Sequence, residues 1–176
     1  MQETIQGNAK VIEGLTPLCP SDGVRHTADA YGNAFHWFHL ANPHKMTEAA
    51  PLLKEAGARL CMISAYNAEQ AEALKELCYH FEIAGIIYNV TLTITGEWPT
   101  VESITPLFAN ADWHEREMME LLNVPITGHP HPTRLFLDEE LDAGVLNEVV
   151  PLSVMMNGAC TTDLWERILK DKEQNA

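Results

Sequence analysis

Residues 78–95 read CYHFEIAGIIYNVTLTIT and hold two runs of β-branched and aromatic residues, separated only by Ala84 and Gly85. A two-residue break that ends in glycine is typical of the tight turn between two antiparallel strands. In the second run, asparagine and threonine alternate with large apolar residues, which indicates one buried face and one wet face. The stretch therefore predicts a β-hairpin that packs one face on a hydrophobic core.

Two apolar stretches on the N-terminal side of this hairpin have the length of strands. Residues 35–40 (FHWFHL) alternate large side chains with histidine, as a strand does. Residues 58–66 (ARLCMISAY) form a near-continuous apolar run, which is typical of a strand covered on both faces. Both stretches are predicted to join the hairpin in one sheet.

Helical patterns lie between and after these strands. Thr47 is the expected N-cap of a helix that carries Pro51 in its first turn and ends at Gly57, because glycine accepts the left-handed conformation at a helix end. Residues 69–77 (EQAEALKEL) have a short helical pattern, and residues 101–108 (VESITPLF) have a short, interrupted one. Strands and helices in this order are typical of a two-layer fold.

The sequence accordingly divides the chain into three parts. Residues 34–137 are predicted to form a two-layer α/β (α+β) domain with a mixed sheet. Residues 1–33 hold prolines and glycines without a sustained period, which predicts an irregular N-terminal extension with one short element near Lys10–Leu15. Residues 138–176 are predicted to be an extended docking tail, because their isolated apolar clusters can be buried only against the core or a partner.

The charge balance excludes two classes of partner. The 176 residues include 25 acidic and 11 basic ones, and the net charge of −14 repels polyanions, so neither nucleic acid nor anionic lipid is expected to bind. No apolar run approaches the roughly 20 residues that cross a bilayer, and the amino terminus does not have the order of a signal peptide. We expect a cytoplasmic protein without direct membrane insertion.

The four cysteines, Cys19, Cys61, Cys78 and Cys160, stand far apart. They form neither a CxxC pair nor another spacing that zinc and iron–sulfur sites use. We expect reduced, mostly buried thiols, since Cys61 and Cys78 lie inside apolar stretches. The cysteines therefore predict no cofactor in this chain.

The stretch DWHEREMMELLNVPITGHPHPTRLF, residues 112–136, is dense in ionisable groups. Asp112 and Glu115 have the spacing of a capping box, in which the aspartate caps a helix and the glutamate reaches back to the same turn. At about 100° per residue, that helix has two distinct faces. Met118, Met119, Leu121 and Leu122 form an apolar back with Glu115 inside it, and Arg116, Glu117 and Glu120 form a charged front beside Trp113.

The charged front allows three interpretations: a solvated face, an acid–base site or a docking surface. A run of charges usually marks a solvated face. Catalysis needs a nucleophile or a cofactor beside such groups, and the sequence has neither a glycine-rich phosphate loop nor a nucleophile elbow. We therefore expect no catalytic residue in this chain.

Three histidines, His114, His129 and His131, invite comparison with a metal site. An HxH pair can chelate a metal, but a third ligand and a set of residues that orient the ligands are also needed, and the sequence identifies neither. The prolines on both sides of His131 instead fix an extended segment, which suits a strip of chain laid along a partner. We expect no bound metal.

Residues 114–136, HEREMMELLNVPITGHPHPTRLF, resemble the signature of the 30-kilodalton subunit of respiratory complex I. The family pattern has an acidic–Arg–acidic triplet, a further acid and two apolar residues before Gly-His-Pro and a basic residue. The family usually has two consecutive basic residues where this chain has Thr133 and Arg134. The resemblance extends back to about Phe35. The matching positions are Glu115, Arg116, Glu117, Glu120, Leu121, Leu122, Gly128, His129, Pro130 and Arg134.

The resemblance implies a subunit without cofactor on the peripheral, cytoplasmic arm of a membrane complex. There it packs on the large catalytic subunit and near the small iron–sulfur subunit, and touches the membrane arm only indirectly. Two parts of the chain, residues 58–66 and the tail from Arg134 onward, are more similar to the small related subunit of energy-converting, membrane-bound nickel–iron hydrogenases.

The leading hypothesis is thus an accessory scaffold subunit of such a hydrogenase, which couples ferredoxin-linked hydrogen evolution to ion translocation. The first alternative is the equivalent 30-kilodalton subunit of an NADH-quinone oxidoreductase. The second is a free-standing small metalloprotein that uses His114, His129 and His131. Under the first two hypotheses the subunit interface is predicted to include Glu115, Arg116, Glu117, Glu120, His129, Pro130, His131 and Arg134.

Overall fold

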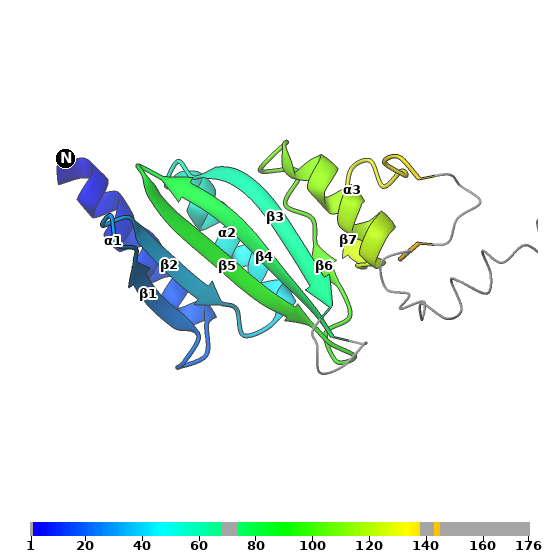
Figure 1. The fold of residues 1–176 in the computed structure, drawn as a ribbon, viewed down its shortest axis with the longest axis horizontal. Helices are drawn as coiled ribbons and strands as arrows, with labels where there is room; N and C mark the ends of the chain where they lie inside the picture. The colour runs from blue at the N-terminus through cyan, green and yellow to red at the C-terminus, as the bar shows by residue number, and fades with distance from the viewer. Residues whose placement is uncertain (1, 68–73, 138–142, 145–176) are drawn as a thin grey trace, which may run out of the picture.

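The computed structural model describes residues 2–67, 74–137 and 143–144, with side chains from residue 9 onward. Figure 1 shows a sheet that lies across two helices, with a third helix beside the edge strand β3. The helices are α1 (Gln2–Leu15), α2 (Met46–Glu55) and α3 (Ala111–Leu122), with short 3-10 turns η1 (Thr16–Leu18) and η2 (Pro43–Lys45). The strands are β1 (Val24–Ala28), β2 (Ala34–His39), β3 (Arg59–Asn67), β4 (Lys75–Ile83), β5 (Ile86–Ile94), β6 (Val101–Glu102) and β7 (Ile126–Thr127).

The predicted hairpin is confirmed as β4 and β5. Ala84 and Gly85 both have positive φ, 50° and 83°, as the two central positions of a type I′ turn require. The amide of Gly85 also donates to Oε1 of Glu82 at 2.6 Å. One face of the hairpin is buried, as its alternation predicted. This face consists of Leu77, Tyr79, Phe81, Ile83, Tyr88, Val90, Leu92 and Ile94.

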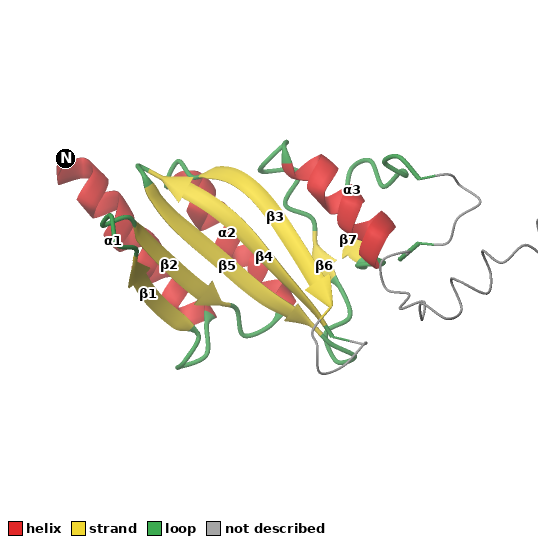
Figure 2. Ribbon diagram, in the orientation of Figure 1, coloured by secondary structure: helices red, strands yellow, loops and turns green. Residues whose placement is uncertain are grey.

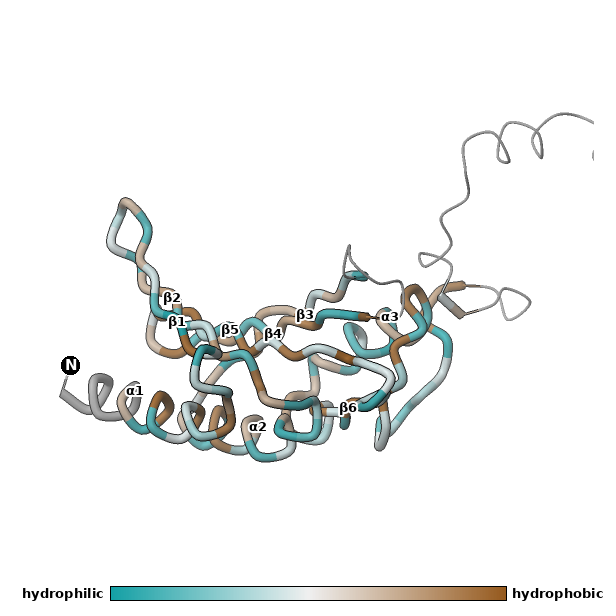
Figure 3. Tube along the Cα trace, turned by 90° about the horizontal axis from the view of Figure 1, so that it is seen from below, coloured by the Kyte–Doolittle hydropathy of each residue, from teal (hydrophilic) through white to brown (hydrophobic). Residues whose placement is uncertain are grey.

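The sheet has five strands in the order β1-β2-β5-β4-β3. Only β2 and β5 run parallel, and the other pairs are antiparallel, so the sheet is mixed. Helices α1 and α2 cover one face of the sheet, while no helix of the described residues covers the other in the view from below (Figure 3). Leu53 and Met46 of α2 are fully buried beneath this sheet, together with Phe38 of β2. The predicted two-layer α/β class is confirmed.

Residues 1–33 contain more regular structure than the predicted irregular extension. Helix α1 spans most of the first half, and its Val11 and Leu15 belong to the core. Gly14 faces Leu52 of α2 so closely that a Cβ there would lie 3.1 Å from the leucine Cδ1. Strand β1 then pairs with β2 along its whole length. The short element predicted near Lys10–Leu15 is the C-terminal part of α1, and the sequence pattern missed the rest of this helix because too few apolar residues recur in it.

Helix α2 differs from its predicted ends. It begins at Met46, one residue before the expected N-cap, and the hydroxyl of Thr47 donates to the His44 carbonyl instead of capping the helix. Pro51 lies inside the helix and not in its first turn. The predicted stop is confirmed, since Gly57 has a φ of 75° directly after the helix.

Strand β3 was predicted to be covered on both faces, and this is wrong. It is the edge strand of the sheet, and Met62 and Tyr66 are 47% and 53% exposed. Cys61 is exposed at a bulge between Leu60 and Met62, which corrects the expectation of a buried thiol there. Cys78 is buried as expected, and this burial raises the pKa of its thiol to about 12. Cys160 lies outside the described residues.

Two predicted helical pieces do not form as expected. Residues 75–77 of the stretch 69–77 belong to β4, and most of the remainder lies outside the described residues. Residues 101–108 form β6 and turns (Figure 2), because the amides of Val101 and Ser103 donate to the carbonyls of Pro125 and Thr127. Strand β6 thereby pairs with β7, which the local sequence pattern did not predict as its partner.

Most of the predicted docking tail, residues 138–142 and 145–176, lies outside the described residues, so it stays a prediction. The described end, Gly144, lies against the C-terminal half of α3, where its amide donates to the Glu120 carbonyl at 2.8 Å. Among the described residues, no helix combines the length and the hydropathy that crossing a membrane demands.

The two turn residues of the hairpin should respond oppositely to substitution. Ala84→Asn should raise the free energy of unfolding by about 0.5–1 kcal/mol, because asparagine tolerates positive φ better than alanine does. Gly85→Ala should lower it by about 1 kcal/mol for conformational reasons alone, since no atom lies within 4 Å of a Cβ placed there. Urea unfolding of the full chain measures both, and equal effects of the two changes would contradict the turn type.

Candidate functional site

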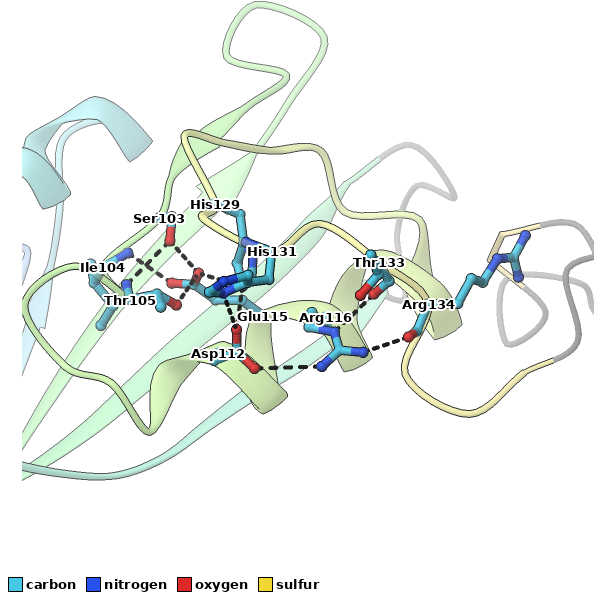
Figure 4. A network of polar contacts seen from close by, with 10 residues as sticks. All are labelled: Ser103, Ile104, Thr105, Asp112, Glu115, Arg116, His129, His131, Thr133 and Arg134. Atoms are coloured by element: carbon cyan, nitrogen blue, oxygen red, sulfur yellow. Dashed lines mark hydrogen bonds and ion pairs between the residues drawn. The ribbon is translucent and has the colours of Figure 1, made fainter.

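The charged stretch of the sequence folds into α3 and a segment that returns along it. The helix ends where Asn123 adopts the left-handed conformation, with φ 50° and ψ 46°. After β7, residues 128–137 run back beside the helix, so side chains of α3 face this segment (Figure 4). The segment therefore covers part of the predicted charged front.

Glu115 is the most buried charged residue at this site, with no exposed surface. Its carboxylate accepts hydrogen bonds from Ser103 Oγ at 2.5 Å, from the Ile104 amide at 2.8 Å and from Thr105 Oγ1 at 2.9 Å. These bonds fix the loop between β6 and α3 onto the helix. Buried carboxylates persist in proteins only when such donors replace the lost water.

The predicted capping box is wrong. The helix begins at Ala111, and Asn110 stands at the N-cap position without a side-chain bond to the first turn. Asp112 lies inside the first turn, where Oδ2 pairs with Arg116 Nη1 at 3.5 Å. Because Glu115 turns toward the preceding loop, it has no role at the helix start. The sequence has the spacing of a capping box, but Asp112 pairs with Arg116 of the same helix and Glu115 accepts hydrogen bonds from residues 103–105.

His129 lies between these two carboxylates, and its side chain has no exposed surface. Its Nδ1 accepts a hydrogen bond from the His131 amide at 3.0 Å, so in the neutral ring the proton resides on Nε2. That Nε2 lies 3.6 Å from Glu115 Oε2 and 3.7 Å from Asp112 Oδ1. The histidine of the Gly-His-Pro motif is thus an internal contact of the subunit.

Arg116 holds the returning segment by its carbonyls. Its Nε donates to the Thr133 carbonyl at 2.8 Å, and its Nη2 donates to the Arg134 carbonyl at 2.5 Å. Only 16% of its side chain is exposed. The guanidinium therefore joins the first turn of α3, through Asp112, to residues 133–134 (Figure 4).

Glu120 was predicted on the charged front but is only 3% exposed. Its carboxylate accepts hydrogen bonds from three successive amides, those of Leu135, Phe136 and Leu137. Burial works to raise the pKa of this carboxyl, but the three donors together hold the pKa below its usual value of 4.5. These bonds hold residues 135–137 against α3.

The remaining predicted residues lie outward. Glu117, Pro130 and His131 are exposed, and Arg134 is half-buried. His131 Nδ1 lies 3.8 Å from Asp112 Oδ1. In the part of the chain that the structure describes, no three side chains of His, Cys, Asp or Glu converge as metal ligands would, so His114, His129 and His131 do not assemble a metal site.

The sequence interpretation did not identify the partners of Glu115. Ser103 and Thr105 stand ten and more positions before it, and their loop was expected to be helical. A polar-apolar-polar SIT stretch beside a buried glutamate is the signal that could have found them. The whole arrangement holds chain segments in place.

Removing the Glu115 carboxylate should be far more damaging than removing its exposed neighbour. Glu115→Ala leaves three buried donors without an acceptor and should lower the free energy of unfolding by roughly 3–5 kcal/mol. Glu115→Gln keeps one acceptor oxygen, so its loss of unfolding free energy should be smaller than that of Glu115→Ala. The matched control Glu117→Ala, at an exposed position of the same helix, should change it by under about 0.5 kcal/mol. Urea titration of the full chain gives all three values, and similar losses for Glu115→Ala and Glu117→Ala would refute the buried network.

The Glu120 contacts should make the returning segment sensitive to acid. Because the folded pKa of Glu120 lies below its unfolded value, these contacts stabilise the fold fully above pH 4.5 and are lost as the pH falls through the lower, folded pKa. Amide hydrogen exchange of residues 135–137 should therefore accelerate below pH 4.5, after correction for intrinsic exchange. In Glu120→Gln this additional acceleration should be absent, and its persistence would assign the acid response to another group.

Relatives of this chain are quinone oxidoreductase subunits. Subunit J of the NAD(P)H-quinone oxidoreductase of Synechococcus sp. (strain RCC307) is 51% identical over 57 residues, which are 32% of either chain. A subunit of the NADH-quinone oxidoreductase of Rhodopseudomonas palustris (strain TIE-1) is 43% identical over 79 residues, 44% of this chain and 39% of that protein. The chain thus spans less than half the length of these curated relatives.

Two solved structures share the fold. The trypsin-resistant fragment (1–134) of Nqo5 has a TM-score of 0.54 at 19% identity, over 71% of this chain and 98% of that chain. A chain of the membrane-bound sulfane sulfur reductase, an archaeal respiratory membrane complex, has a TM-score of 0.54 at 17% identity, over 77% and 79%. The family described as "Respiratory-chain NADH dehydrogenase, 30 Kd subunit" matches residues 40–159, which is more than half of the chain. This chain therefore belongs to the family of the 30-kilodalton subunit of the respiratory-chain NADH dehydrogenase.

Proposed function

We propose that this chain is a cofactor-free accessory subunit that holds together the peripheral, cytoplasmic arm of a complex I-like oxidoreductase. Its partners are a large catalytic subunit and a small iron–sulfur subunit, and it reaches the membrane only through them. The observation that carries the proposal is where the signature residues make their hydrogen bonds. Glu115, Arg116 and Glu120 bond to other segments of the same subunit and hold them in place, so these side chains are not directed at a substrate.

This fixed strip and the outer face of α3 offer a surface to another protein. Trp113 is 69% exposed on the helix, and Phe136 is 62% exposed at the end of the strip. Large aromatic side chains held on rigid backbone are typical anchors of protein–protein interfaces. Glu117, Pro130 and His131 lie exposed on the same elements. The predicted interface is thus retained at its exposed residues, while its buried members act from inside by positioning the strip.

For the type of complex, we retain the membrane-bound nickel–iron hydrogenase as the leading assignment. Its support is the similarity of residues 58–66 and of the tail to the small subunit of that class. The alternative, the equivalent subunit of a quinone-reducing complex, is favoured by the names of the curated relatives. The two structural likenesses have equal TM-scores and do not separate the alternatives.

The proposal is tested by purifying the tagged chain from its native host in mild detergent. We expect a stoichiometric complex with a hydrogenase-type large subunit, and hydrogen evolution from reduced methyl viologen by that complex. NADH-dependent quinone reduction by the complex would favour the alternative. A free, monomeric chain that carries a stoichiometric metal or turns over a substrate alone would overturn both assignments.

A matched pair of variants locates the interface in the same preparation. Trp113→Ala should lower the yield of complex at least fivefold, because an exposed aromatic anchor of an interface contributes about 1–2 kcal/mol or more. Tyr31→Ala removes a side chain that is 92% exposed in the turn after β1, far from α3, and should leave the yield unchanged. Neither variant should alter the thermal unfolding of the free chain. Equal yields for both variants would remove α3 from the interface.

A further inference from the structure

The edge of the sheet at β3 directs backbone groups outward. The two-residue turn of the hairpin makes Ile83 and Ile86 a hydrogen-bonded pair, so every second residue of β4 bonds to β5 and the residues between bond to β3. His80 and Cys78 accordingly bond to Met62 and Ser64 of β3. The alternate residues of β3 therefore point their amides and carbonyls away from the sheet. They include Ile63 and Ala65, which pair with Tyr79 and Leu77.

Leu60 provides an independent check of this alternation. It pairs with Phe81, so its backbone should also point outward. Its carbonyl indeed accepts a hydrogen bond from Asn110 Nδ2 at 2.9 Å, at the start of α3. The outward amides of Ile63 and Ala65, by contrast, have no hydrogen-bond partner in the described part of the chain. The edge is closed at one end and open further along.

A groove follows the open part of this edge. Its cavity measures about 260 Å³ and lies between four consecutive residues of β3, numbers 62–65, and the C-terminal half of α3. Met118, Leu121 and Leu122 give it an apolar wall, and the exposed Glu117 supplies a carboxylate. Backbone donors, apolar pockets and one charge are the features that recognise an extended peptide by strand addition.

The two edges of the sheet differ in how they are protected. Strand β1 has five residues, and Arg25, His26 and Thr27 are exposed along it, as is usual where an edge must not pair. Strand β3 has nine residues, and beyond Arg59 it carries neither a charge nor a proline to discourage pairing. Helix α3 lies beside β3, but it leaves the outward amides of Ile63 and Ala65 without a partner in the described residues, so we expect this part of the edge to be covered in the working state.

We propose that an extended segment of a partner polypeptide adds to β3 beside Ile63 and Ala65 as a sixth strand. Its alternate apolar side chains enter the groove against Met118 and Leu121, and a lysine or arginine reaches Glu117. The inference rests on the proposed function, because that function supplies the partner subunit. It specifies the chemistry of the segment, which is extended, apolar on one side and basic.

Charge decides between the possible occupants. A second copy of the chain has a net charge of −14 and meets Glu117 with the wrong sign. The chain's own residues 138–176 hold nine acidic and three basic residues, a difference of −6, and are disfavoured for the same reason. A basic segment of a partner is attracted by the whole subunit and by the groove.

The first experiment compares amide hydrogen exchange in the free full chain and in the purified complex. The amides of Ile63 and Ala65 should exchange quickly in the free chain and become at least about 100-fold slower in the complex, as hydrogen-bonded strand amides do. Exchange that is equally fast in both states would overturn the strand addition, while the proposed function would survive. Failure to recover any complex would count against the proposed function, and the strand addition would then be decided by the second experiment.

A second experiment needs no complex. A synthetic peptide of alternating lysine and valine, eight residues long, should bind the full chain and slow the same two amides. Glu117→Lys should weaken this binding about tenfold, and Glu13→Lys, an equal charge change on α1 at the far end of the sheet, should leave it nearly unchanged. The corresponding peptide of glutamate and valine should bind much more weakly, and equal binding of the two peptides would overturn the proposed chemistry.

The same measurement tests whether the chain's own tail occupies the groove. If the Ile63 and Ala65 amides are already slow in the free full chain, and removal of residues 145–176 makes them fast, the tail occupies the groove and the proposal is wrong. Concentration-dependent protection in the free chain, with dimers in sedimentation, would equally replace the partner segment by a second copy.

Discussion

A single buried carboxylate, that of Glu115, decides how α3 joins the rest of the subunit. The helix lies beside the sheet and does not cover a face of it (Figure 1), so apolar burial alone fixes its position less firmly than that of α2. Glu115 joins it through three hydrogen bonds to residues 103–105, which follow β6. Taking a carboxylate out of water costs several kcal/mol unless donors replace the water. The loop at residues 103–105 and α3 therefore stabilise one another through this carboxylate.

The residues of the family's signature motif therefore act mainly within the subunit, where they hold several chain segments together. An acidic–Arg–acidic triplet on an exposed helix suggests a surface, and part of the triplet does remain exposed at Glu117. Glu115 points to the loop at residues 103–105, and Arg116 points to the chain that returns after β7 and binds its carbonyls. The further acid of the motif, Glu120, binds amides of the same returning chain. The segment between them has no secondary structure of its own to hold it. Side chains of the helix supply the hydrogen bonds that a neighbouring strand would otherwise provide.

The features that the sequence predicted are those decided locally. The hairpin followed from two turn residues and from alternation within each strand, and both are properties of neighbours in sequence. The end of α2 at Gly57 is local for the same reason. The exposure of β3 depends on its place in the strand order, and the burial of Glu120 depends on residues 15 positions later. Neither can be read from periodicity, because an apolar run looks the same at the centre and at the edge of a sheet. The capping-box spacing failed because the carboxylate of Glu115 found stronger partners elsewhere.

The parallel pairing of β2 with β5 also constrains the order in which the chain can be assembled. Phe38 lies opposite Val90, 52 residues further along, whereas β4 and β5 meet across two residues. Closing a longer loop costs more chain entropy, so contacts of this range form late. During synthesis, the pair of strands β1 and β2 has no further neighbour in the sheet until β5 has left the ribosome. Until then, apolar residues such as Val11, Leu15 and Phe38 have only part of the core to enter, because the buried residues of β4 and β5 are still missing. The folding of the first third of the chain therefore depends on residues that are synthesised later.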